Sequence, residues 1–129
     1  MTTRKPSQVS DIHWLQVHAP DPPPVVDSGK WMIFVPREEV DLTWLKVRNA
    51  VLTNLLGYAA KVSTARPTQY PEGRHVICVY TGDAGNKEDV MRVREKLREL
   101  GIAEDPIPYK TDSATLAGNY GKKSHKYRA

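Results

Sequence analysis

Residues 30–36, Lys-Trp-Met-Ile-Phe-Val-Pro (KWMIFVP), form the stretch that decides the fold. Gly29 precedes the run, Pro36 closes it, and apolar side chains occupy both of its alternating faces. Such a run predicts a strand in the centre of a sheet, buried on both sides. The run HVICVYT at residues 75–81 predicts a second buried strand.

An amphipathic helix is predicted after each of these strands. The two apolar stripes at helical spacing comprise Val40, Trp44, Val47, Val51 and Leu55, and then Val90, Val93, Leu97 and Leu100. Asp41 is a candidate cap for the first helix, and Gly57 is a candidate left-handed residue at its end. In the second helix, Asn86 is the candidate cap and Gly101 is the candidate left-handed residue at the end.

Each helix is followed by a further strand, YAAKVST at residues 58–64 and IPYK at residues 107–110. Residues 30–64 and 74–110 therefore each read strand, helix, strand. Two such units sharing one sheet predict an α+β fold: a curved mixed or antiparallel sheet, with both helices on one face, of ferredoxin-like or related type. The second face is left to be covered by the chain ends or used for binding.

We expect two parts in the chain. Residues 1–29 hold five of the ten prolines and predict an extended N-terminal arm, of which residues 12–17 dock as a strand or turn; a disordered tail is the alternative. Residues 30–129 form a single α+β domain. Its basic C-terminal tail, which contains regularly spaced tyrosines, is expected to be ordered, against the alternative of a solvated appendage.

Composition excludes several classes of protein. Nineteen Lys and Arg against fifteen Asp and Glu give a net charge of +4, which mildly favours anionic partners. Cys78 is the single cysteine, which excludes a disulfide framework and a classical zinc finger. The four histidines lack metal-ligand spacing, so we expect neither a metal nor a cofactor. No apolar run is long enough for a membrane span, which predicts a soluble cytoplasmic protein without a membrane partner.

The strongest candidate for chemistry is a set of cations that could converge on one phosphate. Its members are Lys61, Arg66, Arg74, Lys110 and the basic cluster of the tail, Lys122, Lys123, Lys126 and Arg128. The alternative is that each is a solvated surface charge. Trp14 and Trp31 could stack on a base, although Trp31 also fits a core position. The loop TGDAGN at residues 81–86 is a weaker candidate anion site, because it lacks the lysine of a P-loop.

Five segments carry a family resemblance: GKWMIFVP (29–36), AKVSTARP (60–67), HVICVYTGD (75–83), IPYKTDSATLAGNYG (107–121) and KYR (126–128). They resemble a family of small proteins whose bacterial and phage members are labelled phosphothreonine lyase domain proteins. The eukaryotic relatives are basic proteins with a fold similar to the cap-binding translation initiation factor (eIF4E-like). The resemblance is most specific in the tail pattern that begins with Lys110, Thr111 and Asp112, which we include among the expected ligand-binding residues.

The lyase label implies β-elimination of phosphate, in which a base removes the Cα proton and cations hold the phosphate. By residue type, Lys61 or Lys110 would be the base and His75 or His125 the acid. Arg66, Arg74 and Arg128 would clamp the phosphate. The cap-binding analogy implies instead a nucleotide held between Trp14 and Trp31.

We therefore expect a cationic pocket that binds a phosphorylated ligand, either a nucleotide or a phosphopeptide. Two alternatives remain open. One is phosphothreonine lyase activity, so enzyme status is undecided. The other is a phage or host regulatory module that binds another protein through the N-terminal arm without catalysis.

Overall fold

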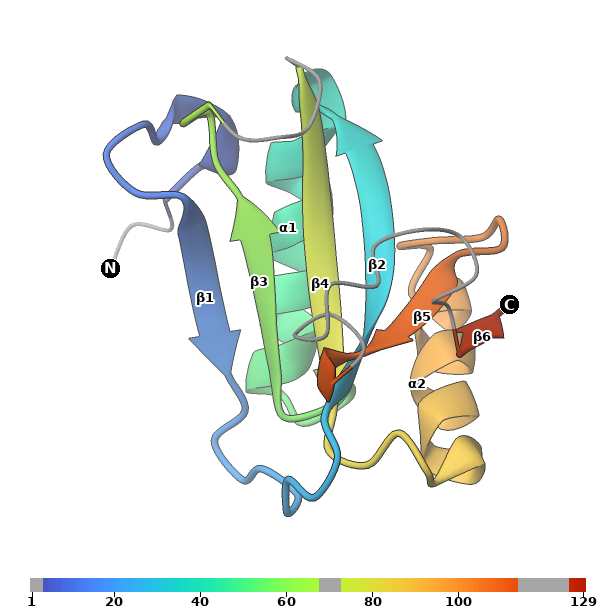
Figure 1. The fold of residues 1–129 in the computed structure, drawn as a ribbon. Coiled ribbons are helices and arrows are strands. Elements are labelled where there is room, and N and C mark those ends of the chain that lie inside the picture. Colours follow the sequence, from blue (N-terminus) through green and yellow to red (C-terminus); the bar gives the residue numbers. More distant parts are fainter. Residues whose placement is uncertain (1–3, 68–72, 114–125) are drawn as a thin grey trace.

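The computed structural model describes residues 4–67, 73–113 and 126–129, and within them it shows a six-stranded sheet (Figure 1). The strand order across the sheet is β1-β3-β4-β2-β5-β6, and every neighbouring pair of strands is antiparallel. The elements in chain order are η1 (Pro6–Gln8), β1 (Trp14–His18), β2 (Gly29–Pro36), α1 (Arg37–Leu52), β3 (Ala59–Ser63), β4 (Arg74–Thr81), α2 (Lys87–Glu99), β5 (Pro108–Thr111) and β6 (Tyr127–Arg128).

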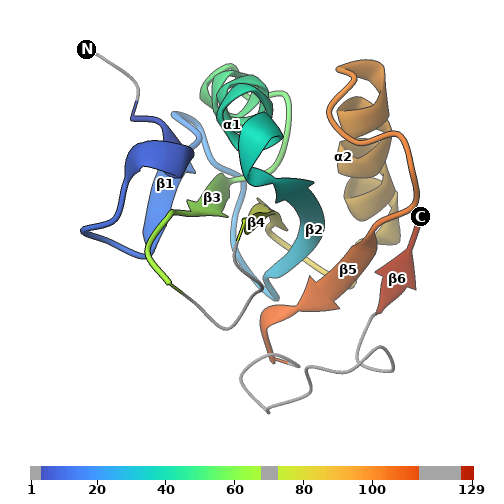
Figure 2. The ribbon, with the colours of Figure 1, turned by 90° about the horizontal axis from the view of Figure 1, so that it is seen from above.

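Helices α1 and α2 pack on the same face of this sheet, as the view from above shows (Figure 2). Helix α1 connects β2 to β3, and β4 lies between those two strands. Helix α2 connects β4 to β5, with β2 between them. This is the split β-α-β arrangement of two interleaved units. The predicted α+β fold, with two strand-helix-strand units and the helices on one face, is confirmed.

The two apolar runs are the neighbouring strands β2 and β4, which pair over the whole length of β2. Side chains alternate along β2, so that Trp31 and Ile33 enter the core under the helices. Met32 and Phe34 point to the second face, where Phe34 is exposed. The predicted burial on both faces therefore holds for only part of β2.

The N-terminal region supplies an edge strand. Residues 14–18 form β1, which pairs with β3 from Trp14 opposite Ser63 to His18 opposite Ala59. Val17 is buried in the main core. This part of the predicted arm is thus a strand of the same sheet.

Both predicted end signals of α1 are wrong. The helix begins directly after Pro36, and Asp41 accepts hydrogen bonds from Ser7 instead of capping the helix. The positive φ of 58° belongs to Asn54. Gly57 has another reason to be glycine, since a Cβ there would lie 1.7 Å from the Tyr80 carbonyl oxygen. Backbone crowding by β4, which local sequence does not reveal, accounts for this residue.

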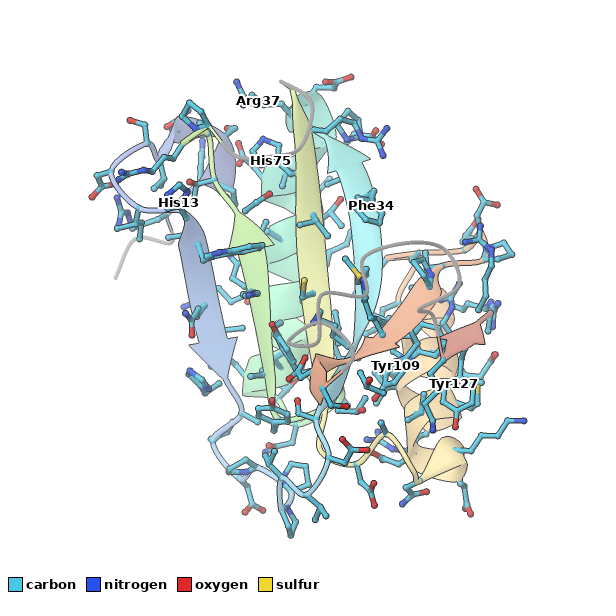
Figure 3. All side chains as sticks on the ribbon, viewed as in Figure 1. His13, Phe34, Arg37, His75, Tyr109 and Tyr127 are labelled. Carbon is cyan, nitrogen blue, oxygen red and sulfur yellow. The ribbon has the colours of Figure 1, made fainter. Side chains whose placement is uncertain are left out.

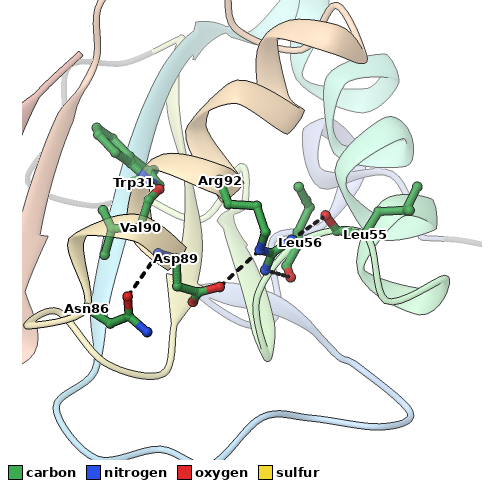
Figure 4. A network of polar contacts seen from close by, with 7 residues as sticks. All are labelled: Trp31, Leu55, Leu56, Asn86, Asp89, Val90 and Arg92. Carbon is green, nitrogen blue, oxygen red and sulfur yellow. Dashed lines mark hydrogen bonds and ion pairs between the residues drawn. The ribbon is translucent and has the colours of Figure 1, made fainter.

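The end signals of α2 are confirmed. The Asn86 side chain accepts from the Asp89 amide, and Gly101 has a φ of +68°. Figure 4 shows how α2 is tied to the rest of the fold: Arg92 bonds Asp89 and donates to the carbonyl oxygens of Leu55 and Leu56.

Candidate functional site

The face of the sheet turned away from α1 and α2 carries three lysines, and we call it the lysine face. It is formed by alternate side chains of five strands, because those between them enter the core. Its members are Trp14, Gln16 and His18 from β1, Lys61 and Ser63 from β3, Arg74, Val76, Cys78 and Tyr80 from β4, Lys30, Met32 and Phe34 from β2, and Pro108 and Lys110 from β5.

Aromatic and cationic side chains alternate across this face. The Lys61 ammonium lies 4.0 Å from the centroid of the Trp14 ring and 5.9 Å from that of the Tyr80 ring. On the far side of β4, the Lys30 ammonium also lies 5.9 Å from the Tyr80 centroid. Lys110 then stands opposite Lys30 in the pairing of β2 with β5. The row Trp14, Lys61, Tyr80, Lys30 and Lys110 thus crosses five strands.

A shallow cavity of about 280 Å³ opens at the β1 side of this row. Its lining residues are Gln16, His18, Tyr58, Ala59, Ala60, Lys61 and Tyr80. The Tyr58 and Tyr80 rings are 5.8 Å apart at 47°, and the Tyr58 hydroxyl is 2.5 Å from the Ser28 hydroxyl. The cavity therefore combines ring surfaces with a cation and amide groups, a lining suited to a ring-bearing anion.

Two like charges are held together at the β5 end of the row. Lys30 and Lys110 are only 7% and 5% exposed. Burial, and then the charge of Lys30, lower the pKa of Lys110. Asp112 offsets part of this charge through a 3.0 Å ion pair with Lys30. The β5 end of the row therefore holds two buried ammonium groups on neighbouring strands, with the Asp112 carboxylate beside one of them.

Cys78 and Tyr80, on the same face, keep their protons at neutral pH. Burial raises the pKa of the Cys78 thiol to about 11. Burial likewise raises the pKa of Tyr80 well above its usual value. Tyr80 therefore offers a ring and a neutral hydroxyl, and Cys78 is a buried apolar group with little thiolate.

Trp31 has no ring face open to a ligand, which contradicts its proposed stacking role. The side chain is 0% exposed, and its indole N–H donates to the Val90 carbonyl at 3.0 Å (Figure 4). Its ring meets Tyr109 edge to face, with the centroids 5.1 Å apart. The alternation of β2 puts it under α2, so Trp14 alone of the two remains available on the lysine face.

His75 is also held in the interior, away from the lysine row. The side chain is 1% exposed, and its Nε2 accepts from the Arg37 guanidinium at 3.1 Å while Nδ1 lies 2.8 Å from the Ser63 carbonyl. Figure 3 shows His75 beside Arg37, at the opposite end of the sheet from Tyr109 and Tyr127. Both ring nitrogens are engaged, so the geometry opposes the proposed role of general acid. His125 lies outside the described residues.

The three arginines of the predicted clamp occupy separate places. Arg66 is exposed beyond the end of β3 and donates to the Asp11 carbonyl at 2.9 Å. Arg74 is exposed at the start of β4, 5.9 Å from the Phe34 ring centroid. Arg128 is exposed in β6, at the edge beyond β5. Arg74 belongs to the lysine face, and Arg128 pairs with Pro108 and therefore has the same orientation at the β6 edge. Arg66 lies beyond the end of its strand. The three arginines thus occupy three separate positions and do not gather into one clamp.

Thr111 and Asp112 follow Lys110 at the end of β5. Thr111 pairs with Gly29, and Asp112 donates its amide to the Ser28 carbonyl at 2.9 Å. These contacts place the Asp112 carboxylate beside Lys30. Asp112 therefore contributes a negative charge to the site, through its ion pair with Lys30.

The loop at residues 81–86 is folded around its own carboxylate. The Asp83 side chain accepts from the Gly85 amide at 2.9 Å, and the Asp83 carbonyl accepts from Asn86 at 3.0 Å. Ala84 donates to the Asp27 carbonyl. These bonds occupy the donors that an anion would need, so the structure gives no support to an anion site in this loop.

Sequence reasoning missed Lys30 and Tyr80. Both lie in runs that were read as apolar on two faces, yet each sits at an alternate position that points away from the helices. The alternation of side chains along a strand could have identified them. It puts a lysine at the start of one central strand and a tyrosine near the end of its neighbour on the face away from the helices.

Two further searches cover the described residues alone. In residues 4–67, 73–113 and 126–129, three or more His, Cys, Asp or Glu side chains do not gather in a way that could hold a metal ion. Neither helix within those ranges has the length and apolarity required to traverse a bilayer.

The fold is similar to that of solved eIF4E proteins. A schistosome eIF4E, in complex with m7GpppA and 4E-BP, matches with a TM-score of 0.62 and 18% identity over 79% of this chain. Ascaris suum eIF4E-3 with an m2,2,7G cap matches at 0.54 and 16% identity over 78%. Ascaris suum eIF4E-3 with an m7G cap likewise has a TM-score of 0.54 and 16% identity over 78% of this chain. The chain spans 58% of the schistosome protein and 57% and 56% of the two Ascaris structures. At these identities, the likeness shows an eIF4E-like fold.

A family model identifies the family of the sequence itself. The model described as basophilic leukemia-expressed protein Bles03 matches residues 23–117, a range that runs from before β2 to just beyond β5. The matched range thus contains Lys30, Lys61, Tyr80 and Lys110, and it excludes β1 with Trp14. Because the match covers most of the sequence, this eIF4E-like chain belongs to the Bles03 family.

Proposed function

We propose that the lysine face binds a nucleotide, with the base against Trp14 and the phosphates among the lysines. The observation that carries the proposal is the alternating row of rings and ammonium groups on one face of the sheet. Rings favour stacking on bases, and lysines neutralise phosphates. The eIF4E structures of similar fold hold m7GpppA, m7G cap or m2,2,7G cap, which makes a guanine nucleotide the first ligand to test. We place this activity in the cytoplasm.

The dimensions of the site agree with a nucleotide more closely than with a phosphopeptide. The cavity lined by Lys61 and Tyr80 has a volume of about 280 Å³, which is room for one ring system. The Lys30 and Lys110 pair lies two strands further along the sheet. A base against Trp14 and a polyphosphate directed past Lys61 and across Tyr80 toward β5 would contact both ends of the row. A single phosphate on a side chain would use one end.

Isothermal titration calorimetry with m7GTP, GTP, ATP and inorganic triphosphate tests this proposal. We expect measurable binding of at least one nucleotide. Each of Trp14→Ala and Lys61→Gln should weaken it by about tenfold, because base stacking and a charged hydrogen bond each contribute about 1.5 kcal/mol. Lys46→Gln, an exposed lysine on α1, is the matched control and should leave affinity unchanged. Absence of binding by all four ligands at millimolar concentration refutes the proposal.

Phosphothreonine lyase activity is the second candidate, and the lowered pKa of Lys110 is the observation that favours it. A lysine can remove a Cα proton only when a sizeable fraction of it is neutral. If the protein is a lyase, a phosphothreonine peptide will lose phosphoric acid and gain a double bond, as mass spectrometry can detect. Lys110→Arg should abolish this reaction. Failure of both assays would favour the third reading, a module that binds another protein.

A further inference from the structure

Residues 4–13, the first described part of the N-terminal arm, are hydrogen-bonded to α1 through Ser7. The Ser7 amide donates to one oxygen of the Asp41 carboxylate at 2.9 Å, and the Ser7 hydroxyl donates to the other at 2.5 Å. Ser7 lies in the short helix η1, and Asp41 lies in α1, 34 residues later. This paired contact uses both carboxylate oxygens, and one of its two bonds needs the hydroxyl proton of Ser7.

The arm is further held at the end of β3 by backbone contacts. Ala65 donates to the carbonyl oxygens of Pro6 at 3.1 Å and of Val9 at 2.8 Å. Pro6 and Val9 are buried there. The Ala65 amide is therefore a reporter for arm docking: its hydrogen is protected while the arm is in place and exposed when the arm leaves.

The residues before Ser7 are those that basic-directed protein kinases select. The sequence reads Arg4-Lys5-Pro6-Ser7, with positive charge three and two positions before the serine. Arg4 and Lys5 are exposed, and Ser7 is partly exposed. Ser10, in the same arm, has no basic residue at either position.

We propose that Ser7 is a phosphorylation site and that its modification detaches the arm from α1. A kinase transfers the γ-phosphoryl group of ATP to Ser7 Oγ: the new O–P bond forms as the bond to the bridging oxygen of ADP breaks, and the hydroxyl proton passes to the kinase base. The product carries a charge of about −1.5 to −2 and lacks the hydroxyl donor. It faces the Asp41 carboxylate, so attraction becomes repulsion.

The proposal predicts a specific change in amide exchange. The full chain is phosphorylated with a basic-directed kinase and ATP, the modified residue is assigned by peptide mass spectrometry, and hydrogen exchange is followed by NMR. We expect modification at Ser7, with exchange at Ala65 faster by about tenfold or more, because a hydrogen bond to a charged group is replaced by repulsion between two anions. Amides in β4 should keep their protection.

Matched variants separate the charge effect from general damage. Ser7→Asp should accelerate Ala65 exchange, whereas Ser10→Asp, which adds the same charge three residues away, should not. Asp41→Asn replaces the repelling carboxylate by an amide that can donate to phosphate, so phosphorylation should change exchange much less in this background. The proposal is overturned if the kinase leaves Ser7 unmodified. It is equally overturned if phosphoserine at this position leaves Ala65 exchange unchanged, or if Ser10→Asp has the same effect as Ser7→Asp.

Discussion

Replacing Arg94 by Met should cost more stability than any surface change on the same helix. Arg94 is 0% exposed although it is an arginine in α2. Its guanidinium donates to the backbone oxygens of Ala129 at 2.8 Å, Ala103 at 2.7 Å and Asp105 at 2.8 Å. These three acceptors lie on both sides of β5 in the sequence, so one side chain holds the segments that position β5 and β6. Burial lowers the pKa of Arg94, which still leaves it charged at neutral pH.

The expected loss of stability is the difference between the hydrogen bonds that are lost and the desolvation cost that is removed. Three hydrogen bonds from a charged donor contribute about 1.5–3 kcal/mol each, while removal of a buried charge returns part of its desolvation cost. The net loss on Arg94→Met should be about 3–5 kcal/mol in the free energy of unfolding, because three carbonyls lose their partner in the interior. Urea denaturation measures it.

Arg98→Met is the matched control for this experiment. Arg98 lies one turn further along α2, and its bond to Glu95 is with a side chain that is 64% exposed. The control should lose less than about 1 kcal/mol. If Arg94→Met and Arg98→Met lose equal stability, the assignment of Arg94 as the anchor of the β5 and β6 region is wrong.

Three further predictions concern single residues. Gly57→Ala should lower stability by at least about 2 kcal/mol in urea denaturation, because its Cβ would meet the Tyr80 carbonyl oxygen, whereas Gly85→Ala should cost less than half as much. Cys78 should resist alkylation in the native protein at pH 8 and react on unfolding, since its thiol pKa is raised to about 11; rapid native labelling would contradict this burial. Because the pKa of Lys110 is lowered in the folded protein, the unfolded chain binds more protons between that pKa and the ordinary lysine value of 10.5, so stability should rise with pH in that window. Lys110→Met should flatten the rise while weakening nucleotide binding.

Much of the fold was predictable from the sequence because the signals were local. The apolar runs of β2 and β4, the stripe of α2 and its Asn86 cap are all properties of neighbouring residues. The errors arose where a distant segment decides the local outcome. Asp41 accepts hydrogen bonds from Ser7, which lies 34 residues earlier. Position 57 must be glycine because the backbone of β4 leaves no space for a Cβ.

The candidate site was harder to predict, because it depends on which strands become neighbours. Lys61 and Lys110 were placed on one face by alternation and strand order, and they are separated by β4 and β2. The arginines were chosen by residue type, and they lie at three separate strand ends: Arg74 at the start of β4, Arg128 at the end of β6 and Arg66 beyond β3. Trp31 was mispredicted for a similar reason. An indole in a strand points either into the core or away from it, and the pairing with other strands decides which.

The central claim is that one face of the sheet, with its row of rings and lysines, is the binding surface. Backbone amide NMR during titration with m7GTP tests it most directly. The account predicts that the shifted amides cluster in β1, β3, β4, β2 and the start of β5, around Trp14, Lys61, Tyr80 and Lys110. Shifts confined to α1, α2 or the loop at residues 81–86, or the absence of any shift at millimolar nucleotide, would contradict it.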